Sequence, residues 1–406
     1  MPRQEDGLAA GYDFAMPPMI RFGAGRIAEI GDLVGLWGRE AWIVGGGRSL
    51  VASGAGDRIE AACAAMGIPH RRVATSSGEP TVDHVAGALA SLPRGDRSGV
   101  VVVAVGGGST IDLAKAVAAL APLLPADDLD SLVVDHLEGV GSGRSIRHWP
   151  LPLIAIPTTA GTGAEATRNA VISCPRRGFK KSMRSPLMVP RAAVVDPELT
   201  ASCDRGTILA SGLDCITQLV ESYVCRYAKP LPRGLVLEAL PGALEALPRL
   251  LAPRAAAADG DDRAAARAAM SHAALVSGIA LANSGLGLAH GVAAALGIAC
   301  NAPHGLACAT MLPATLRVNW AACGHELATL ERAANPAAPL SDDDAADAFV
   351  DRIDRLCADA PRRLGQIGVR ADQIDWLAEH SGGNSMRGNP VQLDTAAVRR
   401  LLADML

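Results

Sequence analysis

Four polar side chains in the second half of the sequence have the types and spacing of a metal site. Asp214 and Gln218 are four residues apart, so both face one side of a helix. His290 and His304 lie downstream among small apolar residues. A carboxylate and two imidazoles can hold a divalent transition metal such as Fe(II) or Zn(II), and the Gln218 amide oxygen could add a fourth donor. Taken singly, Asp214 could cap a helix, Gln218 could be a surface residue, and each histidine could be a hydrogen-bonded core residue.

A second stretch, residues 100–115, has the form of an anion site. Its β-branched run over residues 100–105 is typical of a parallel strand buried on both faces. The glycines at 106–108 let the backbone turn tightly and approach a ligand. Ser109 or Thr110 can cap the helix that follows, and the free N–H groups at its start favour phosphate. The stretch has neither G-x-G-x-x-G spacing nor a P-loop ending. On these residues alone, a pyrophosphate cradle and an ordinary strand-to-helix turn both remain open.

The elements that must position these residues alternate between strand and helix in the first half of the chain. This rhythm predicts a parallel sheet with right-handed crossovers. The expected strands are residues 41–44, 71–75, 100–105, 153–156 and 192–195, with residues 121–150 as a connecting excursion. Beyond residue 197 the apolar residues follow a helical period, and the expected helices are 207–227, 234–247, 263–282 and 348–360, the second kinked or broken at Pro241. We therefore predict an α/β domain over residues 1–197 and an all-helical domain over residues 198–406.

Composition and charge narrow the class of protein. The 406 residues are 49% hydrophobic but only 3% aromatic, so small aliphatic side chains build the core. The formal net charge of -4 gives no reason to expect a nucleic acid or an acidic membrane as partner. The nine cysteines are scattered without a CxxC pair, which suits free thiols in a reducing cytosol. No signal peptide and no uncharged apolar span is evident, so we expect a cytoplasmic protein.

Taken together, the motifs resemble those of the iron-containing (group III) alcohol dehydrogenases, in the superfamily that includes glycerol dehydrogenase and dehydroquinate synthase. They run in the family's order, and the similarity spans roughly residues 18–400. The matching segments are Gly106 to Ser109 with Asp112 and Lys115, Pro157 to Glu165, Gly212 to Asp214, Gly285 to His290, and Pro303 to Gly305. The resemblance implies an N-terminal α/β domain for NAD or NADP, a helical C-terminal domain for metal and substrate, and a cleft between them.

The resemblance also implies roles for single residues. It makes Asp214, His290 and His304 metal ligands and the catalytic centre, and places Gln218 where the family has a fourth ligand, a histidine. With the residues after the strand at 41–44, the expected cofactor contacts are Gly46, Gly47, Arg48, Gly106, Gly107, Gly108, Ser109, Asp112, Thr158, Thr159, Thr162 and Lys180. An acidic residue after that strand would favour NAD; Arg48 could instead attract the 2′-phosphate of NADP, or be merely solvated. We therefore expect tolerance of NADP.

Two departures from the family pattern concern the metal and the proton relay. Gln218 leaves the formal charge unchanged but replaces a nitrogen donor by a weaker oxygen donor. We therefore expect weaker metal binding, a different metal preference, or no functional metal. Ala294 stands where the family often has another histidine near the substrate, so a proton relay would use water, the cofactor ribose or another residue.

The sequence thus predicts an NAD(P)-dependent alcohol dehydrogenase, or aldehyde or ketone reductase, in which a metal acts as Lewis acid during hydride transfer. The expected partner is a small alcohol or aldehyde, and the resemblance implies a homodimer or larger homo-oligomer. The alternatives are a metal-independent reductase similar to maleylacetate reductase, a lyase like dehydroquinate synthase, and a dinucleotide-binding protein that has lost catalysis.

Overall fold

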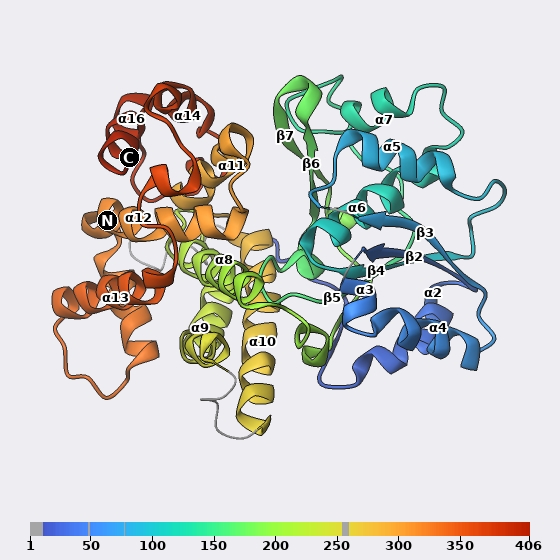
Figure 1. The fold of residues 1–406 in the computed structure, drawn as a ribbon, viewed down its shortest axis with the longest axis horizontal. Coiled ribbons are helices and arrows are strands. Elements are labelled where there is room, and N and C mark those ends of the chain that lie inside the picture. Colours follow the sequence, from blue (N-terminus) through green and yellow to red (C-terminus); the bar gives the residue numbers. More distant parts are fainter. Residues whose placement is uncertain (1–10, 48, 77, 254–259) are drawn as a thin grey trace. The chain divides into compact units, whose positions relative to one another are not determined.

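The computed structural model describes residues 11–47, 49–76, 78–253 and 260–406. These residues form two compact units, shown in Figure 1. One unit is Ala15–Cys203, and the other is Asp204–Leu406, with which residues 11–14 group. Each unit has its own buried apolar clusters.

A six-stranded parallel sheet organises the first unit, in the order β1-β8-β5-β4-β2-β3. The strands are β1 (Met19–Phe22), β2 (Glu40–Gly46), β3 (His70–Ser76), β4 (Val100–Gly106), β5 (Leu153–Pro157) and β8 (Ala192–Val195). The predicted parallel α/β architecture of the N-terminal half is confirmed.

The sheet is covered on both faces, which explains the β-branched run of β4. Successive side chains of a strand point to opposite faces. Accordingly, Val100 and Val102 belong to one apolar cluster, whereas Val101 and Val103 belong to another. The first cluster includes residues of α5 (Val82–Ser91), α6 (Gly108–Leu120) and α7 (Leu129–Asp135), and the second includes residues of α2 (Ile30–Trp37), α3 (Ser49–Ala52) and α4 (Ala55–Ala65).

An antiparallel hairpin after β5 was not among the expected strands. It consists of β6 (Asn169–Cys174) and β7 (Phe179–Arg184). Ala170, Ile172 and Cys174 are buried while the residues between them are half-buried, so β6 presents one apolar face. The segment 121–150 also contains α7 and is therefore more than a connecting loop.

Helices make up the second unit, as predicted. They are α8 (Arg205–Val224), α9 (Pro230–Leu251), α10 (Gly260–Ser284), α11 (Leu288–Cys300), α12 (His304–Ala334), α13 (Asp342–Leu356), α14 (Ile374–His380), α15 (Asn384–Gly388) and α16 (Thr395–Asp404). The predicted break at Pro241 is wrong, because α9 continues through Pro241 and Pro248. Burial of Leu240 and Leu247 on the same helix offsets the hydrogen bonds that the two prolines remove.

Among the described residues, α10 is the one helix whose length and composition would allow it to cross a membrane. Within its span Asp261–Ser284, 61% of the apolar window is buried inside the protein. Helices that build a protein core have the same properties, so this feature carries no membrane assignment.

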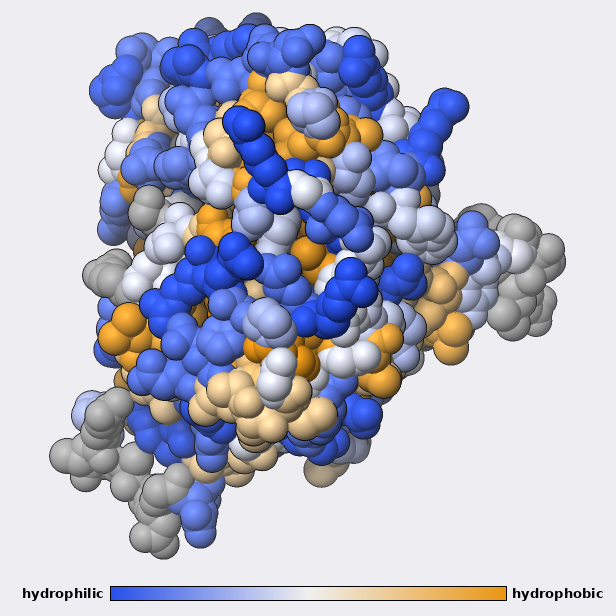
Figure 2. Space-filling model, turned by 90° about the vertical axis from the view of Figure 1, so that its right-hand side faces the viewer, coloured by the Kyte–Doolittle hydropathy of each residue, from blue (hydrophilic) through white to orange (hydrophobic). Residues whose placement is uncertain are grey.

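One face of the molecule, drawn in Figure 2, is largely hydrophilic, with apolar side chains in small groups. Large exposed apolar residues of the first unit include Leu36, Val51, Met66 and Trp149. Scattered apolar residues of this kind are normal on protein surfaces and indicate no particular partner.

Candidate metal site and cofactor-binding region

Three of the four predicted metal ligands, Asp214, His290 and His304, meet in the helical unit, where α12 packs against α8 and α11. Asp214 lies on α8, His290 on α11, and His304 is the first residue of α12. Asp214 Oδ1 lies 3.4 Å from His290 Nε2 and 3.8 Å from His304 Nε2. Asp214 and His290 are buried and His304 is half-buried. His290 and His304 follow Asp214 by 76 and 90 residues in the sequence, yet all three come within reach of one ion.

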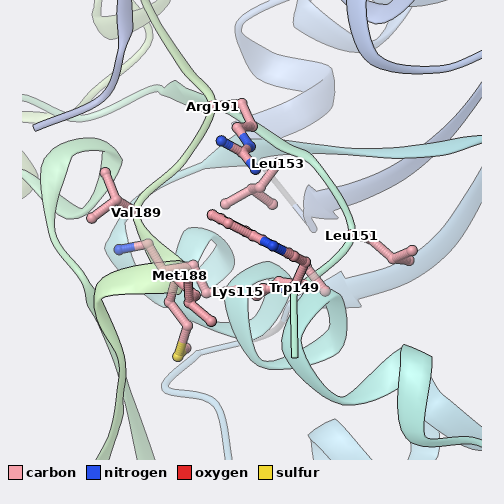
Figure 3. Close-up of a pocket in the computed structure, with 10 residues that line it drawn as sticks. Lys115, Trp149, Leu151, Leu153, Met188, Val189 and Arg191 are labelled. Atoms are coloured by element: carbon pink, nitrogen blue, oxygen red, sulfur yellow. The ribbon is translucent and has the colours of Figure 1, made fainter. Parts of the chain in front are cut away.

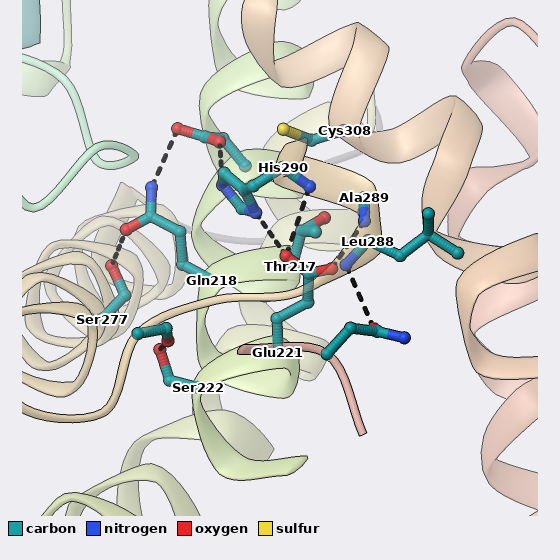
Figure 4. A network of polar contacts seen from close by, with 12 residues as sticks. Thr217, Gln218, Glu221, Ser222, Ser277, Leu288, Ala289, His290 and Cys308 are labelled. Carbon is teal, nitrogen blue, oxygen red and sulfur yellow. Dashed lines mark hydrogen bonds and ion pairs between the residues drawn. The ribbon is translucent and has the colours of Figure 1, made fainter. Parts of the chain in front are cut away.

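Glu221 on α8 fixes the orientation of His290, as Figure 4 shows. Its Oε2 accepts a 2.6 Å hydrogen bond from His290 Nδ1, and the same carboxylate accepts the backbone N–H groups of Ala289 and His290 at 2.7 and 3.3 Å. With Nδ1 occupied, Nε2 is the nitrogen available to a metal. Glu221 was not among the residues predicted from the sequence. Its spacing of seven residues from Asp214, which puts both on one face of α8, was the available signal.

The Gln218 amide faces Ser277 of α10, as Figure 4 shows, and it also contacts Asp214. Its Nε2 donates to Asp214 Oδ2 at 3.0 Å, and its Oε1 accepts from Ser277 Oγ at 3.3 Å. The chemistry dictates this orientation, because an ionised carboxylate can only accept hydrogen bonds. The amide oxygen therefore faces Ser277, and the nitrogen holds the Asp214 carboxylate.

Cys308 is a further donor at this cluster and was not among the predicted site residues. It lies one helical turn after His304 on α12, with Sγ 3.8 Å from His304 Nε2. One donor atom from each of Asp214, His290, His304 and Cys308 lies within 4.8 Å of every other. The signal in the sequence was the spacing of four residues from His304, but nine scattered cysteines gave no reason to single it out.

Two buried donor atoms of the cluster, Asp214 Oδ1 and His290 Nε2, have no hydrogen-bond partner in the described part of the chain. An unpaired buried polar atom costs about 1–3 kcal/mol, and more when the group is charged. Both atoms are directed at the space that the four donors surround. The residues present therefore fit a divalent transition metal.

The side chains of the cluster shift one another's pKa values. Burial by itself would raise the pKa of Asp214, but interaction with His290 and His304 holds it below its usual value. Burial would likewise raise the pKa of the Cys308 thiol, whereas the two imidazoles lower it. Burial lowers the pKa of His290, but Cys308 and Asp214 outweigh this and raise it well above the usual value. A metal ion would displace the protons that these side chains share.

The predicted cofactor residues gather mainly at the carboxyl ends of β2, β4 and β5 in the α/β unit. β2 ends at Gly46, β4 ends at Gly106, and β5 ends immediately before Thr158 and Thr159. Gly47, after β2, donates its N–H to the carbonyl at the end of β3. Ligands of open parallel sheets bind at this edge.

The glycine turn brings the loop after β4 against the loop after β5. A Cβ on Gly108 would lie 2.6 Å from Thr162 Oγ1, and a Cβ on Gly107 would lie 3.4 Å from Thr159 Oγ1. Helix α6 begins at Gly108 and has no side-chain cap, so the predicted cap by Ser109 or Thr110 is wrong: both residues lie inside the helix. Its first N–H groups therefore suit an anion such as phosphate.

Two predicted cofactor residues lie away from these strand ends, and one lies outside the described residues. Asp112 on α6 accepts the backbone N–H of Val171 at 2.9 Å and so joins α6 to β6. Lys180 on β7 pairs with Glu79 at 2.5 Å, and its charge also acts on Asp112. Arg48 is the residue outside the described part of the chain.

A buried lysine ties the loop after β5 to α6. Lys115 Nζ donates to Thr167 O and Thr167 Oγ1, both at 2.7 Å, and to Asn169 O at 3.1 Å. Burial lowers the pKa of Lys115 to about 8, raises that of Asp112 to about 6 and raises that of Glu165 to about 7. These groups stabilise one another's charges inside the α/β unit.

Replacing Glu165 by Gln is expected to stabilise the protein at pH 8. Because burial raises the pKa of Glu165 from 4.5 to about 7, its contribution to stability is lost as the pH rises through 7. Gln does not ionise, so the free energy of unfolding should exceed that of the wild type by about 1–3 kcal/mol at pH 8, with a much smaller difference at pH 5. Urea denaturation of both proteins at pH 5 and pH 8 measures the free energy of unfolding. The same difference between variant and wild type at each pH would refute the raised pKa of Glu165.

A small pocket elsewhere in the α/β unit is lined mostly by residues of apolar type, together with Lys115 and Arg191 (Figure 3). The Arg191 guanidinium lies 4.7 Å from the centre of the Trp149 ring at this pocket. The lining includes Lys115, whose Nζ already donates to three oxygens, and none of the predicted cofactor residues. The pocket is therefore separate from the cofactor-binding region.

The α/β unit has a glycine turn at its strand ends, and the helical unit has a donor set that fits a transition metal. This combination is typical of oxidoreductases that use a dinucleotide. The family model "Iron-containing alcohol dehydrogenase" matches residues 17–197, and "Fe-containing alcohol dehydrogenase family, C-terminal" matches residues 208–406. The chain belongs to the iron-containing alcohol dehydrogenase family, whose members are oxidoreductases that act on alcohols.

Relatives that cover most of the chain agree with this family. "Probable alcohol dehydrogenase EutG" of Escherichia coli is 30% identical over 380 residues, covering 93% of this chain and 90% of that protein. The solved alcohol dehydrogenase from Oenococcus oeni is 27% identical with a TM-score of 0.85, over 98% of this chain and 100% of that one. The sulfoacetaldehyde reductase from Bifidobacterium kashiwanohense, solved in complex with NAD+, is 27% identical with a TM-score of 0.83, over 97% and 98% of the two chains. The predicted dehydrogenase activity is thus confirmed at the level of the family, and the alternatives are not favoured.

Proposed function

We propose that this protein transfers a hydride reversibly between a small alcohol and the nicotinamide of NAD, with tolerance of NADP, forming or consuming an aldehyde or ketone. The donor cluster carries the proposal, because Asp214 Oδ1 and His290 Nε2 lack hydrogen-bond partners among the described residues. The related sulfoacetaldehyde reductase in complex with NAD+ supports NAD as the cofactor. Tolerance of NADP rests on the position of Arg48 in the sequence.

Asp214, His290 and His304 would hold the metal, iron(II) or zinc(II). A divalent ion there would supply Lewis-acid polarisation of the alcohol or carbonyl oxygen. Gln218 holds Asp214 Oδ2 and leaves Oδ1 directed into the cluster, which makes Gln218 a supporting residue as well as a candidate ligand. Glu221 holds the His290 ring so that Nε2 faces the same space.

The cofactor would bind at the carboxyl ends of β2, β4 and β5. The backbone of residues 106–109 would hold the pyrophosphate at the start of α6, where no side chain competes as a cap. Gly46 and Gly47 would line the edge beside it. Thr158 Oγ1 is buried and has no partner among the described residues, which supports a cofactor contact.

Four more residues complete the proposed cofactor site. Thr159 and Thr162 face Gly107 and Gly108 across the turn, so their hydroxyls flank the same backbone. Asp112 would act by anchoring α6 to β6, as its hydrogen bond to Val171 indicates. Lys180 would add a positive charge toward the cofactor phosphates, as the family resemblance implies.

Isotope transfer tests the proposed reaction directly. The full-length protein is incubated with α-deuterated short alcohols and NAD or NADP, as isolated, after complete metal removal, and after reloading with Fe(II) or Zn(II). We expect deuterium in the reduced cofactor, loss of transfer without metal, and recovery on reloading. Transfer that survives metal removal would exclude metal assistance, and absence of transfer from every alcohol would exclude the proposed reaction.

Replacing Glu221 by Gln is expected to weaken metal binding about 10–100-fold, the range typical of partners that orient a ligating histidine. The amide has one acceptor oxygen where the carboxylate accepts from both the imidazole and two backbone N–H groups. Zinc affinity measured by competition with a chromophoric chelator checks this. Glu245→Gln on the exposed face of α9 is the matched control, and equal affinity in the two variants would disprove the role of Glu221.

A further inference from the structure

Cys308 is placed to complete the metal site where the sequence departs from the family at Gln218. We propose that the Cys308 thiolate is the fourth protein ligand of the ion, and that the resulting donor set selects zinc(II) over iron(II). This inference rests on the proposed function, because it concerns the ion of the same site.

The geometry supports a shared ion. His304 and Cys308 are one turn apart on α12, so their side chains leave the same face of the helix. In a tetrahedral zinc site, bonds of about 2.3 Å to sulfur and about 2.0 Å to nitrogen or oxygen keep the ligand atoms about 3.5 Å apart. The separations here are 3.8 Å from Cys308 Sγ to His304 Nε2, and 3.4 and 3.8 Å from Asp214 Oδ1 to the two imidazoles.

The buried donor atoms supply an independent observation that points to a cation. Asp214 and His290 are 3% and 5% exposed, and Oδ1 and Nε2 have no hydrogen-bond partner within the described chain. Cys308 is itself buried against them. A carboxylate and a thiolate together would balance the two positive charges of the ion in a site with little access to water.

Gln218 is occupied elsewhere. Its amide nitrogen faces the Asp214 carboxylate, and its oxygen accepts from Ser277 on α10. Turning the oxygen toward the cluster would set it against the Asp214 oxygen, acceptor against acceptor, and would break the hydrogen bond to Asp214. We therefore infer that Gln218 positions Asp214, whereas Cys308 binds the ion.

A cysteine thiolate in place of the family's fourth ligand, a histidine, changes the metal preference. Thiolate is a soft donor that favours zinc, whereas an additional imidazole suits iron and zinc alike. Binding forms one sulfur–metal bond and releases the thiol proton to solvent, with no change of oxidation state.

Cobalt substitution of the full-length protein tests this assignment with a readout independent of activity. Metal-free protein is loaded with one equivalent of Co(II), whose bond to a thiolate gives a near-ultraviolet charge-transfer absorption. We expect this absorption in the wild type and in Gln218→Ala, and its loss in Cys308→Ala and Cys308→Ser. Cys323→Ala, which changes another buried cysteine of α12, is the matched control and should keep it.

Zinc affinity provides the second measurement. It should fall by more than about 100-fold in Cys308→Ser, beyond the range expected for a residue that only orients a ligand, while Cys323→Ala keeps the wild-type value. If the wild type bound Co(II) without the charge-transfer absorption, or if Cys308→Ser bound Co(II) and kept this absorption, the assignment of Cys308 as a ligand would be overturned. The proposed reaction would be unaffected. Failure to bind Co(II) at all would overturn the assignment together with metal assistance, whereas the absorption without hydride transfer would overturn the reaction alone.

Discussion

Replacing Asp214 by Asn is expected to abolish stoichiometric metal binding and to lower dehydrogenase activity about 10³-fold or more. Asn keeps the shape of the side chain, and its oxygen can still accept the hydrogen bond from Gln218. It then presents an NH₂ group where Asp214 Oδ1 faces the imidazoles of His290 and His304. Losing the only formally charged ligand among the three predicted ones removes several kcal/mol of transition-state stabilisation, or about three powers of ten in rate.

Metal content by mass spectrometry and the rate of alcohol oxidation measure the effect of Asp214→Asn. The control is Asp204→Asn at the start of the same helix, where the side chain caps α8 through the N–H of Thr207 and Asn serves almost as well. If Asp214→Asn retained one equivalent of metal and the wild-type rate, the cluster would not be the catalytic centre.

A methyl group at Gly305 is expected to move α12 away from α8 and so to separate His304 from Asp214. A Cβ at this position would lie 2.0 Å from the carbonyl oxygen of Ala210 and 3.2 Å from Asp214 Cβ. Because the first contact is with backbone, no change of rotamer relieves it. Overpacking of this kind costs about 3 kcal/mol, of which the better helix propensity of Ala returns about 1 kcal/mol.

We therefore expect Gly305→Ala to lower the free energy of unfolding by about 2 kcal/mol. We also expect zinc affinity to fall by at least about tenfold, since a loss of about 1.4 kcal/mol in binding free energy corresponds to a factor of ten. Gly324→Ala is the control on the same helix, because a Cβ there meets no atom within 4 Å. Denaturant unfolding and chelator competition report the two quantities. Wild-type zinc affinity in Gly305→Ala would show that the close approach of α12 to α8 does not position His304.

The central strand and glycine turn were predictable because their signal is local. The β-branched run of β4 can be satisfied only by burial on two faces, and Gly106 to Gly108 can follow it only as a turn. Asp214, His290 and His304 were predictable for another reason: their residue types are costly to bury without a common purpose, and the family motifs join them.

The rest of the site depends on packing that no local pattern contains. Cys308 gains its significance from lying beside His304, and Gly305 gains its own from the carbonyl of Ala210 on another helix. The hairpin β6–β7 escaped prediction because its second strand, Phe179–Arg184, is rich in charge and is held by pairing with β6. In α9, tertiary burial overrides the local preference of Pro241.

Because Glu221 holds both the first turn of α11 and the His290 ring, metal exchange is coupled to fraying of this end of α11. The same carboxylate holds the amide hydrogens that begin α11 and the imidazole that faces the ion. Unwinding the first turn of α11 therefore releases the ligand, and releasing the ligand unfastens the turn. A chelator in excess would then remove the ion at a ceiling rate set by this local opening of the protein and independent of chelator concentration.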